Sequence, residues 1–280
     1  KTMNKKINTI YIISKGRPNC RTAKTLTKMN YKGEWFIVCG NNDETIEKYK
    51  SNWGEDRILI FDWYDEVKRS DLLDNFGVEK MSSGAVPVRN ATRTIAEKRG
   101  EIRHWQFDDD YSSFYHIKDN KKNWFKLNGE QFEKELYKLA EYGDRCKLAN
   151  IGFAVASDTR PEMIHNVGHR VFNAHNMPTD LNLFTEWKSR MNDDLINAIE
   201  TYRKGNYELF VKYMNIQMPP TQSEGGGNTD IYLLDGTVRK AAYAIMIEPK
   251  NVKLTIMHGR YHHRANWAGI IPKVIHSKYA

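Results

Sequence analysis

Short apolar runs alternate with segments of helical spacing through the first 115 residues of this 280-residue chain. Runs typical of buried strands cover residues 7–14, 34–40, 57–63 and 102–107. Helical patterns lie between them, at residues 21–29, 45–53 and 90–100. Strands that alternate with helices favour a parallel, doubly wound sheet with ligands beyond the carboxyl ends of its strands. The pattern therefore predicts an α/β fold.

Three loops follow carboxyl ends of these predicted strands, at residues 14–20, 40–44 and 108–111. Because such ends meet at one edge of a parallel sheet, we expect the loops to converge on one crevice. The first loop, SKGRPN, lacks the GxxxxGK[ST] pattern of a P-loop, which disfavours a P-loop kinase or ATPase.

Helical and strand-like patterns alternate less regularly in the second half of the chain. Helical spacing marks residues 132–139 and 192–203, and apolar runs at 151–157, 241–247 and 252–257 are strand-like. Residues 218–230, MPPTQSEGGGNTD, have the composition of a flexible loop. We expect one domain with two halves, residues 1–115 and 116–280.

Positive charge gathers at both ends of the chain, whose formal net charge is +8. Residues 1–33 contain nine lysines and arginines and no acid, and residues 231–280 contain eight against two acids. Such segments indicate surfaces that meet phosphate, either of a nucleotide or of a nucleic-acid backbone. A solvated basic surface is the alternative.

The three cysteines are far apart and form no CxxC pair, so the sequence indicates neither a disulfide framework nor a zinc ribbon. No apolar run has the length of a membrane span. These features predict a soluble, cytoplasmic protein without membrane contact, and a monomer or small oligomer.

Residues 84–111 read GAVPVRNATRTIAEKRGEIRHWQFDDDY and end in three adjacent aspartates. The segment resembles the ARN…A-x-G-E…DDD pattern of family 2-like glycosyltransferases with the GT-A fold, with a longer spacing between Ala96 and Gly100. The resemblance implies a mostly parallel central sheet, a nucleotide-sugar-binding half at 1–115 and an acceptor-binding half at 116–280. The matching positions are Arg89, Asn90, Ala96, Gly100, Glu101, Asp108, Asp109 and Asp110.

The chemistry of such an enzyme explains why three adjacent aspartates would be present. A sugar nucleotide leaves as a diphosphate, and a hard divalent cation held by carboxylates neutralises that charge. The resemblance implies that Asp108 meets the ribose or base and that Asp110 binds Mn²⁺ or Mg²⁺, with Asp109 in either role. Adjacent carboxylates tolerate one another when a cation lies among them.

Further candidates for binding the donor come from the other loops. Ser14, Lys15 and Arg17 follow the first strand and are candidate contacts of phosphate or base, although Lys15 and Arg17 can also be exposed loop charges. The turn that contains Asp43 resembles a turn that meets uracil in these enzymes. The alternative role of Asp43 is to cap the helix that follows it. Arg89 is expected at the nucleotide or beside a neighbouring acid.

An inverting transferase needs a general base beside the acceptor hydroxyl. Asn192 is the predicted N-cap of the helix at 192–203, which puts Asp193 and Asp194 in its first turn. Acids at this place also favour the helix dipole, which is the structural alternative. If the helix extends back to Trp187, Asp194 lies on the apolar side and Asp193 faces away, so we predict Asp194 as the base.

The tail LTIMHGRYHHRANW places histidines and arginines between aromatic residues. Family resemblance implies a C-terminal histidine in the metal shell; His258 is the first candidate, and His262 and His263 are the alternatives. Arg260 and Arg264 are candidate diphosphate contacts, although a solvated basic surface would have the same composition.

The opening IYIISKGRP resembles the TET-associated, phage-type glycosyltransferases. That resemblance implies a UDP-sugar donor and 5-hydroxymethylcytosine in phage DNA as acceptor, in the cytoplasm of a bacterial host. A glycan, polysaccharide or protein acceptor is the first alternative. The second is a noncatalytic nucleic-acid-binding protein whose acids are merely solvated.

Overall fold

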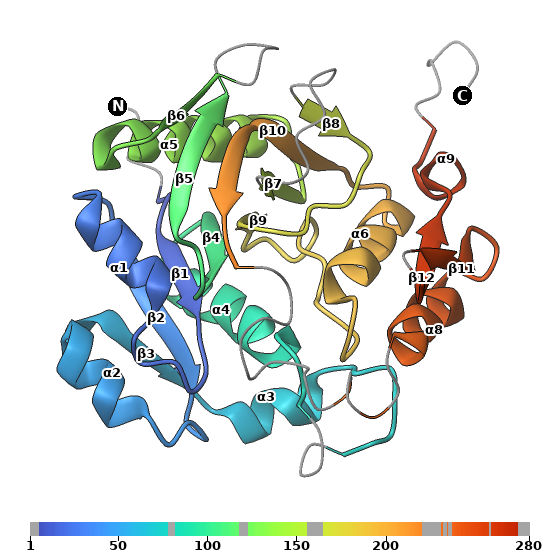
Figure 1. Cartoon of the computed structure of the whole chain (residues 1–280), viewed down its shortest axis with the longest axis horizontal. Helices are drawn as coiled ribbons and strands as arrows, with labels where there is room; N and C mark the ends of the chain where they lie inside the picture. The colour runs from blue at the N-terminus through green and yellow to red at the C-terminus, as the bar shows by residue number, and fades with distance from the viewer. Residues whose placement is uncertain are drawn as a thin grey trace.

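The computed structural model describes residues 6–77, 82–117, 123–155, 165–219, 231, 234, 237–257 and 259–273. Its first 117 residues form strands and helices in near-regular alternation (Figure 1). These elements are β1 (Ile10–Ile13), α1 (Arg21–Lys28), β2 (Trp35–Gly40), α2 (Ile46–Trp53), a 3-10 turn (Glu55–Arg57), β3 (Ile58–Phe61), α3 (Trp63–Arg69), α4 (Val86–Lys98), β4 (Arg103–Asp108) and β5 (Ser113–Ile117). The strands and helices predicted in this half are confirmed.

The rest of the chain adds shorter strands and longer loops. Its elements are β6 (Trp124–Lys126), α5 (Gly129–Arg145), β7 (Asn150–Val155), β8 (His165–Val167), β9 (His175–Pro178), α6 (Asp193–Arg203), β10 (Glu208–Gln217), α8 (Val238–Ile247), β11 (Val252–Met257), β12 (Arg260–Ala265) and α9 (Trp267–Ile270). Most of the predicted loop, residues 220–230, lies outside the described residues.

One ten-stranded sheet takes strands from both sides of residue 115. Its order is β3-β2-β1-β4-β9-β7-β10-β5-β6, with β8 paired to β10. The four strands from β3 to β4 are parallel to one another. β9 then runs antiparallel to β4 and β7, and the sheet becomes mixed. The predicted α/β class and Rossmann-like sheet are confirmed, and β1 lies at the point where the strand order reverses.

Side chains that alternate along β1 pack on opposite faces of the sheet. Ile10 and Ile12 join the main core with residues of α1 and α5, whereas Tyr11 packs on the other face against α4. Such alternation follows from the two-residue period of a strand. The carboxyl ends of β1, β2 and β4 lie at one edge of the sheet, since these three strands are parallel.

The prediction of a strand at 241–247 is wrong, because these residues lie within α8. Ala241 and Ala244, three positions apart, are buried on the same side of that helix, as helical spacing requires. The strand predicted at 252–257 is β11, but its partner is β12 in a separate two-stranded ribbon rather than the main sheet.

The C-terminal elements pack beside α6. Leu195 and Ile199 of α6 share an apolar cluster with Ala244 of α8 and Val252 of β11. Figure 1 shows α8, β11, β12 and α9 along the right-hand edge of the molecule, next to α6. Within the described residues, no helix combines the length and apolarity needed to cross a membrane.

Candidate active site

A cavity of about 370 Å³ lies at the carboxyl ends of β1, β2 and β4. The three predicted loops all contribute to its wall, which confirms their convergence. Lining residues from the loops and strand ends include Ser14, Lys15, Arg17, Gly40, Asn42, Asp108, Asp109 and Asp110. The start of α4 and Asp193 of α6 complete the wall.

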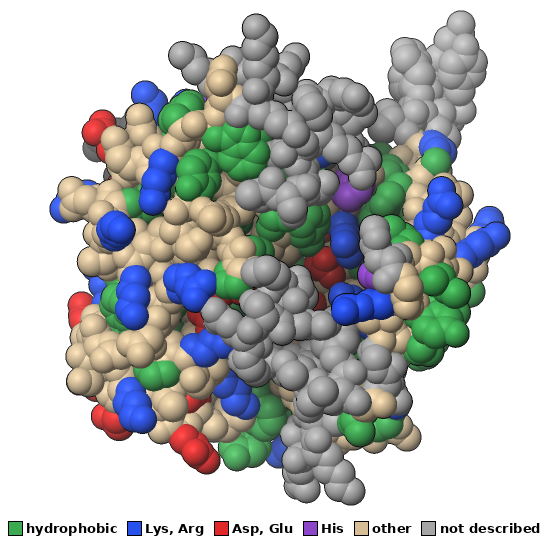
Figure 2. All heavy atoms as spheres, viewed as in Figure 1, with side chains coloured by type: hydrophobic (Ala, Val, Ile, Leu, Met, Phe, Trp, Pro, Cys, Tyr) green, Lys and Arg blue, Asp and Glu red, His purple; other side chains and the backbone are tan. Residues whose placement is uncertain are grey.

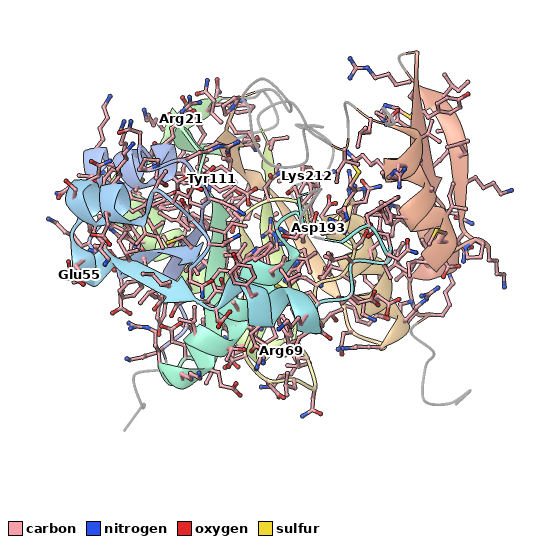
Figure 3. The ribbon with its side chains drawn as sticks, turned by 90° about the horizontal axis from the view of Figure 1, so that it is seen from below. Arg21, Glu55, Arg69, Tyr111, Asp193 and Lys212 are labelled. Carbon is pink, nitrogen blue, oxygen red and sulfur yellow. The ribbon has the colours of Figure 1, made fainter. Side chains whose placement is uncertain are left out.

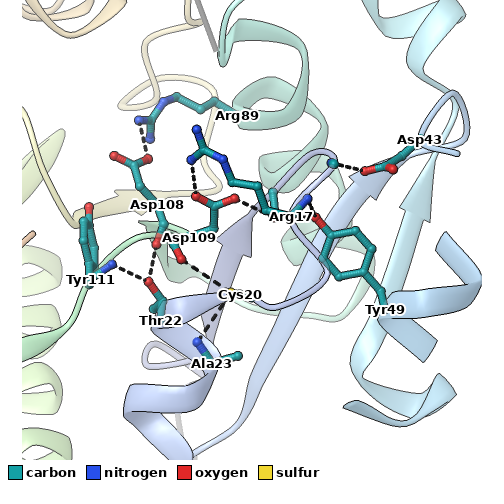
Figure 4. Close-up of polar contacts among 12 residues, drawn as sticks. Arg17, Cys20, Thr22, Ala23, Asp43, Tyr49, Arg89, Asp108, Asp109 and Tyr111 are labelled. Atoms are coloured by element: carbon teal, nitrogen blue, oxygen red, sulfur yellow. Dashed lines mark hydrogen bonds and ion pairs between the residues drawn. The ribbon is translucent and has the colours of Figure 1, made fainter. Parts of the chain in front are cut away.

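Asp109 fixes the shape of the loop after β1. Its carboxylate accepts hydrogen bonds from Ser14 Oγ at 2.6 Å and from an Arg17 guanidinium nitrogen at 2.9 Å (Figure 4). The Tyr49 hydroxyl accepts the Arg17 backbone N–H at 2.9 Å. Both oxygens of Asp109 are thus occupied, so this buried carboxylate orders the phosphate-facing loop.

The turn after the aspartates is held to the start of α1. Backbone N–H groups of Arg21 and Thr22 donate to the Asp109 carbonyl at 2.9 and 3.1 Å. The Thr22 hydroxyl donates to the Asp108 carbonyl at 2.6 Å and accepts the Tyr111 N–H at 2.9 Å (Figure 4). These bonds set the direction in which the three carboxylates leave the strand.

Asp43 braces two loops of the site. One oxygen accepts the Gly16 N–H at 2.7 Å, and the other accepts the N–H and hydroxyl of Thr45 at 2.8 and 2.7 Å. Gly16 has a φ of +68°, a conformation that glycine adopts without a Cβ penalty. Asp43 is not among the cavity-lining residues, and the N-cap of α2 (Ile46–Trp53) is Thr45 without a side-chain cap hydrogen bond, so Asp43 connects loops and does not cap the helix. Its contact with a uracil stays a prediction.

Lys15 and the start of α4 give the cavity a positive side. The Lys15 ammonium lies over the Trp63 ring, 4.9 Å from its centroid. Residues 82–85, Pro87 and Val88 line the opposite wall, and no side chain caps α4. Pro87 in the first turn of α4 has no N–H to donate, so the positive potential here comes from Lys15 and from the dipole of the helix.

Arg89 connects the aspartate triplet to α6. Its guanidinium nitrogens lie 3.0 Å from Asp108 Oδ1 and 3.3 Å from Asp193 Oδ2. Its guanidinium also lies over the Trp187 ring, 4.7 Å from the centroid. The side chain is 6% exposed, and the two carboxylates raise its pKa against the effect of burial. Arg89 thus neutralises one acid from each half of the chain.

Asp110 forms no ion pair or side-chain hydrogen bond with the described residues, although the charge of Arg17 acts on it. Its buried Oδ1 has no hydrogen-bond partner. Burial first, and then Asp108 and Asp109, raise the pKa of Asp110 to about 7. A cation would relieve both the repulsion and the missing contact.

These residues fit a divalent cation of a particular kind. Mg²⁺ commonly binds one or two carboxylates, waters and substrate phosphates instead of an all-protein cage. Within the described part of the chain, no group of three or more His, Cys, Asp or Glu side chains is arranged to hold a metal. Asp110 offers a carboxylate oxygen without a partner to such an ion, and its role as a ligand of Mn²⁺ or Mg²⁺ stays a prediction. His258, the predicted histidine ligand, lies outside the described residues.

Asp193 and Asp194 have different surroundings. α6 begins after Asn192, as the first prediction has it, and does not extend back to Trp187. Asp193 consequently lines the cavity, whereas Asp194 pairs with Arg170 at 3.2 Å. Figure 3 shows Asp193 near the middle of the molecule, between Tyr111 and the C-terminal ribbon.

The surroundings of Asp193 also change its pKa. Burial raises its pKa to about 6, while Arg89 acts in the opposite direction. The expectation that Asp193 faces away from the site is wrong, because it depended on the longer helix. Side chains of adjacent residues in an α-helix point in directions that differ by about 100° around the helix axis.

The predicted arginines of the tail lie elsewhere. Arg260 and Arg264 are exposed side chains of β12 and do not line the cavity. His262 lies on the same face of the ribbon, since side chains two residues apart share a face. His263 points the other way and comes within 3.1 Å of the Asn192 amide nitrogen. The structure therefore does not bring these arginines to the aspartates.

Three site features escaped prediction: Asp193, Trp63 and the wall at 82–88. Trp63 immediately follows β3, so the strand-end rule that found the other loops also applies to it. The wall at 82–88 consists of the residues before α4 and the first residues of that helix, and none of the family-matching positions falls in it. Its position depends on tertiary packing that a single sequence does not reveal.

The fold and cavity together define the class of protein: an α/β protein whose crevice lies at the switch point of its sheet. The sequence model described as TET-Associated Glycosyltransferase matches residues 8–227, and the chain belongs to this family. A search of curated protein sequences finds no significant match. The protein is thus an enzyme that transfers a sugar, and its family supports modified DNA bases as the class of acceptor.

Replacing Arg89 with lysine tests its role as the connection between the halves. One ammonium cannot serve both Asp108 and Asp193, so we expect the free energy of unfolding to fall by about 3 kcal/mol. Urea denaturation followed by tryptophan fluorescence measures this loss. Arg145→Lys is the control, because Arg145 is exposed at the end of α5 and its replacement should cost less than about 1 kcal/mol. Equal losses would contradict the proposed connection.

Proposed function

We propose that this enzyme transfers a sugar from a UDP-sugar to the hydroxymethyl group of 5-hydroxymethylcytosine in DNA, with inversion at the sugar carbon. The observation that carries the proposal is one cavity lined both by Asp110 and by Lys15, Arg17 and the start of α4, within a chain of the TET-associated family. A nucleoside diphosphate needs this combination of charges. Phage DNA would supply such an acceptor.

The donor would lie across the carboxyl ends of β1, β2 and β4. Lys15, Arg17 and the start of α4 would attract its diphosphate, and Asp108 would face its ribose or base. Asp110 would hold Mn²⁺ or Mg²⁺ together with the phosphates. When bound, that ion would neutralise charge on the departing diphosphate.

Asp193 is the general base that the geometry supports. It lines the same cavity as the donor-side residues and belongs to a different half of the chain. Its carboxylate would take the proton of the acceptor hydroxyl as the oxygen bonds to the sugar carbon and the bond to the diphosphate breaks. UDP would leave with the electron pair, and Arg89 would keep Asp193 ionised.

The identity of donor and acceptor is tested by transfer assays with several UDP-sugars and Mn²⁺. We expect UDP release and a mass gain of one sugar in duplex DNA containing 5-hydroxymethylcytosine, and neither with matched cytosine DNA. Chelation with EDTA should abolish both signals. Transfer to oligosaccharides but not to hydroxymethylated DNA would favour the glycan alternative and refute our acceptor.

Paired substitutions identify the base. Asp193→Asn should lower kcat by about 10²–10⁴-fold, because the amide cannot take a proton. Asp194→Asn should cost much less, since Asp194 forms an ion pair with Arg170 outside the cavity lining. Both variants should bind UDP as the wild type does, measured by calorimetry. The reverse order of losses would restore Asp194 as the base.

The pH dependence provides a further readout of the same pair. The base acts as a carboxylate, and the pKa of Asp193 is raised to about 6. Turnover should therefore fall as the pH drops through about 6 and level off above it. Asp194→Asn should keep an acid limb and move it to lower pH, because the charge of Asp194 raises the pKa of Asp193. Loss of the limb in Asp194→Asn would contradict the assignment to Asp193.

A further inference from the structure

The ribbon β11–β12 lies beyond the residues that the family model matches, which end at 227. Neither of its strands contains an acidic residue. The described segment 237–257 and 259–273 contains seven lysines and arginines and one acid, Glu248. This part of the chain adds a strongly positive surface to the enzyme.

One face of the ribbon collects cations without partners. Lys253 lies directly opposite Arg264, and Arg260 is opposite Met257 on the same face. Like charges opposite each other destabilise a strand pair. No hydrogen bond or ion pair connects these three side chains to any residue of the described chain. An external anion would relieve the repulsion.

The Val252–Ala265 end of the ribbon's other face packs against α6, whereas Leu254, Ile256 and Tyr261 on that face stay exposed. Val252 and Ala265 pack in one cluster with Leu195 and Ile199. The Asn192 amide nitrogen donates to the Lys240 carbonyl at 2.6 Å and lies 3.1 Å from His263 Nδ1. Asn192 directly precedes Asp193 in the sequence, so the ribbon is held beside the proposed base.

Further positive charge lies across the site from the ribbon. α1 carries exposed Arg21, Lys24 and Lys28 and contains no acid. Figure 1 places α1 and the ribbon on opposite sides of the molecule. Figure 2 shows acidic side chains deep in a central hollow, with lysine or arginine side chains on both sides of it. An extended polyanion across this face would meet cations on both flanks.

We propose that the β11–β12 ribbon is a docking surface for duplex DNA, which Lys253, Arg260 and Arg264 hold by its phosphates. The inference rests on the proposed function, because it concerns the acceptor of that reaction. Charge complementarity supports DNA, since lysine and arginine make most protein contacts to DNA phosphates. A two-stranded ribbon also has the width that the major groove admits. The ribbon would deliver the acceptor strand to the hollow beside Asp193.

The test combines Lys253→Gln, Arg260→Gln and Arg264→Gln in one full-length variant. Binding of unmodified duplex DNA is measured by fluorescence anisotropy at several salt concentrations, without donor. We expect at least about tenfold weaker binding at 100 mM salt, and a slope of log K against log salt that is shallower by roughly 2 to 3. In transfer assays, KM for duplex DNA should rise while kcat stays within about twofold.

Two control variants test whether the position and the charge of the three ribbon side chains cause the loss of DNA binding. Lys68→Gln, Lys98→Gln and Lys134→Gln together remove the same net charge from exposed positions on α3, α4 and α5, and should leave the salt slope unchanged. Lys253→Arg with Arg260→Lys and Arg264→Lys should keep wild-type binding. Equal loss in both glutamine variants would overturn the ribbon as the docking site.

Other outcomes would point elsewhere. Weaker UDP binding in the ribbon variant would indicate that Arg260 and Arg264 contact the donor, and it would overturn the proposal. The ribbon also exposes Leu254, Ile256 and Tyr261, so sedimentation that shows a wild-type dimer and a monomeric ribbon variant would assign the surface to a second copy. Because the binding assay needs neither donor nor modified base, failed transfer by the wild type would refute the proposed function without deciding this inference.

Discussion

The structure depends on one buried cation, Arg89, between acids from two distant parts of the chain. Its guanidinium meets Asp108 at the end of β4 and Asp193 at the start of α6, and lies over the Trp187 ring. A buried charge is tolerated only when it is paired, so the three side chains fix one another. The distance between the donor side of the crevice and α6 follows from this contact.

The three adjacent aspartates have different partners, and the contact with Arg89 is one of them. Asp108 is neutralised by Arg89, and Asp109 is occupied by Ser14 and Arg17. Asp110 keeps a buried oxygen without a partner. Three adjacent carboxylates are thus stabilised by different means: an ion pair, loop contacts and, in our account, a cation that accompanies the donor.

Local patterns predicted the donor half well because its strands and helices carry clear periodicity, and parallel strand ends must share an edge. They failed where the outcome depended on phase or tertiary partners. The choice between Asp193 and Asp194 turned on where α6 begins, which differs by a few residues between the alternatives. Residues 241–247 are apolar enough for either a strand or a helix, and packing against α6 and the ribbon decides for α8. The prediction that Arg260 and Arg264 contact the diphosphate was based on composition alone. The alternation of side chains along β12 directs both arginines outward.

The central claim is that Asp110 and the donor diphosphate hold the divalent cation together. Electron paramagnetic resonance of Mn²⁺ titrated into the protein tests this directly, with and without UDP. Our account predicts weak binding of Mn²⁺ alone, tight binding in the presence of UDP, and loss of the tight site in Asp110→Asn. Equally tight Mn²⁺ binding with and without UDP, or an intact site in Asp110→Asn, would contradict it.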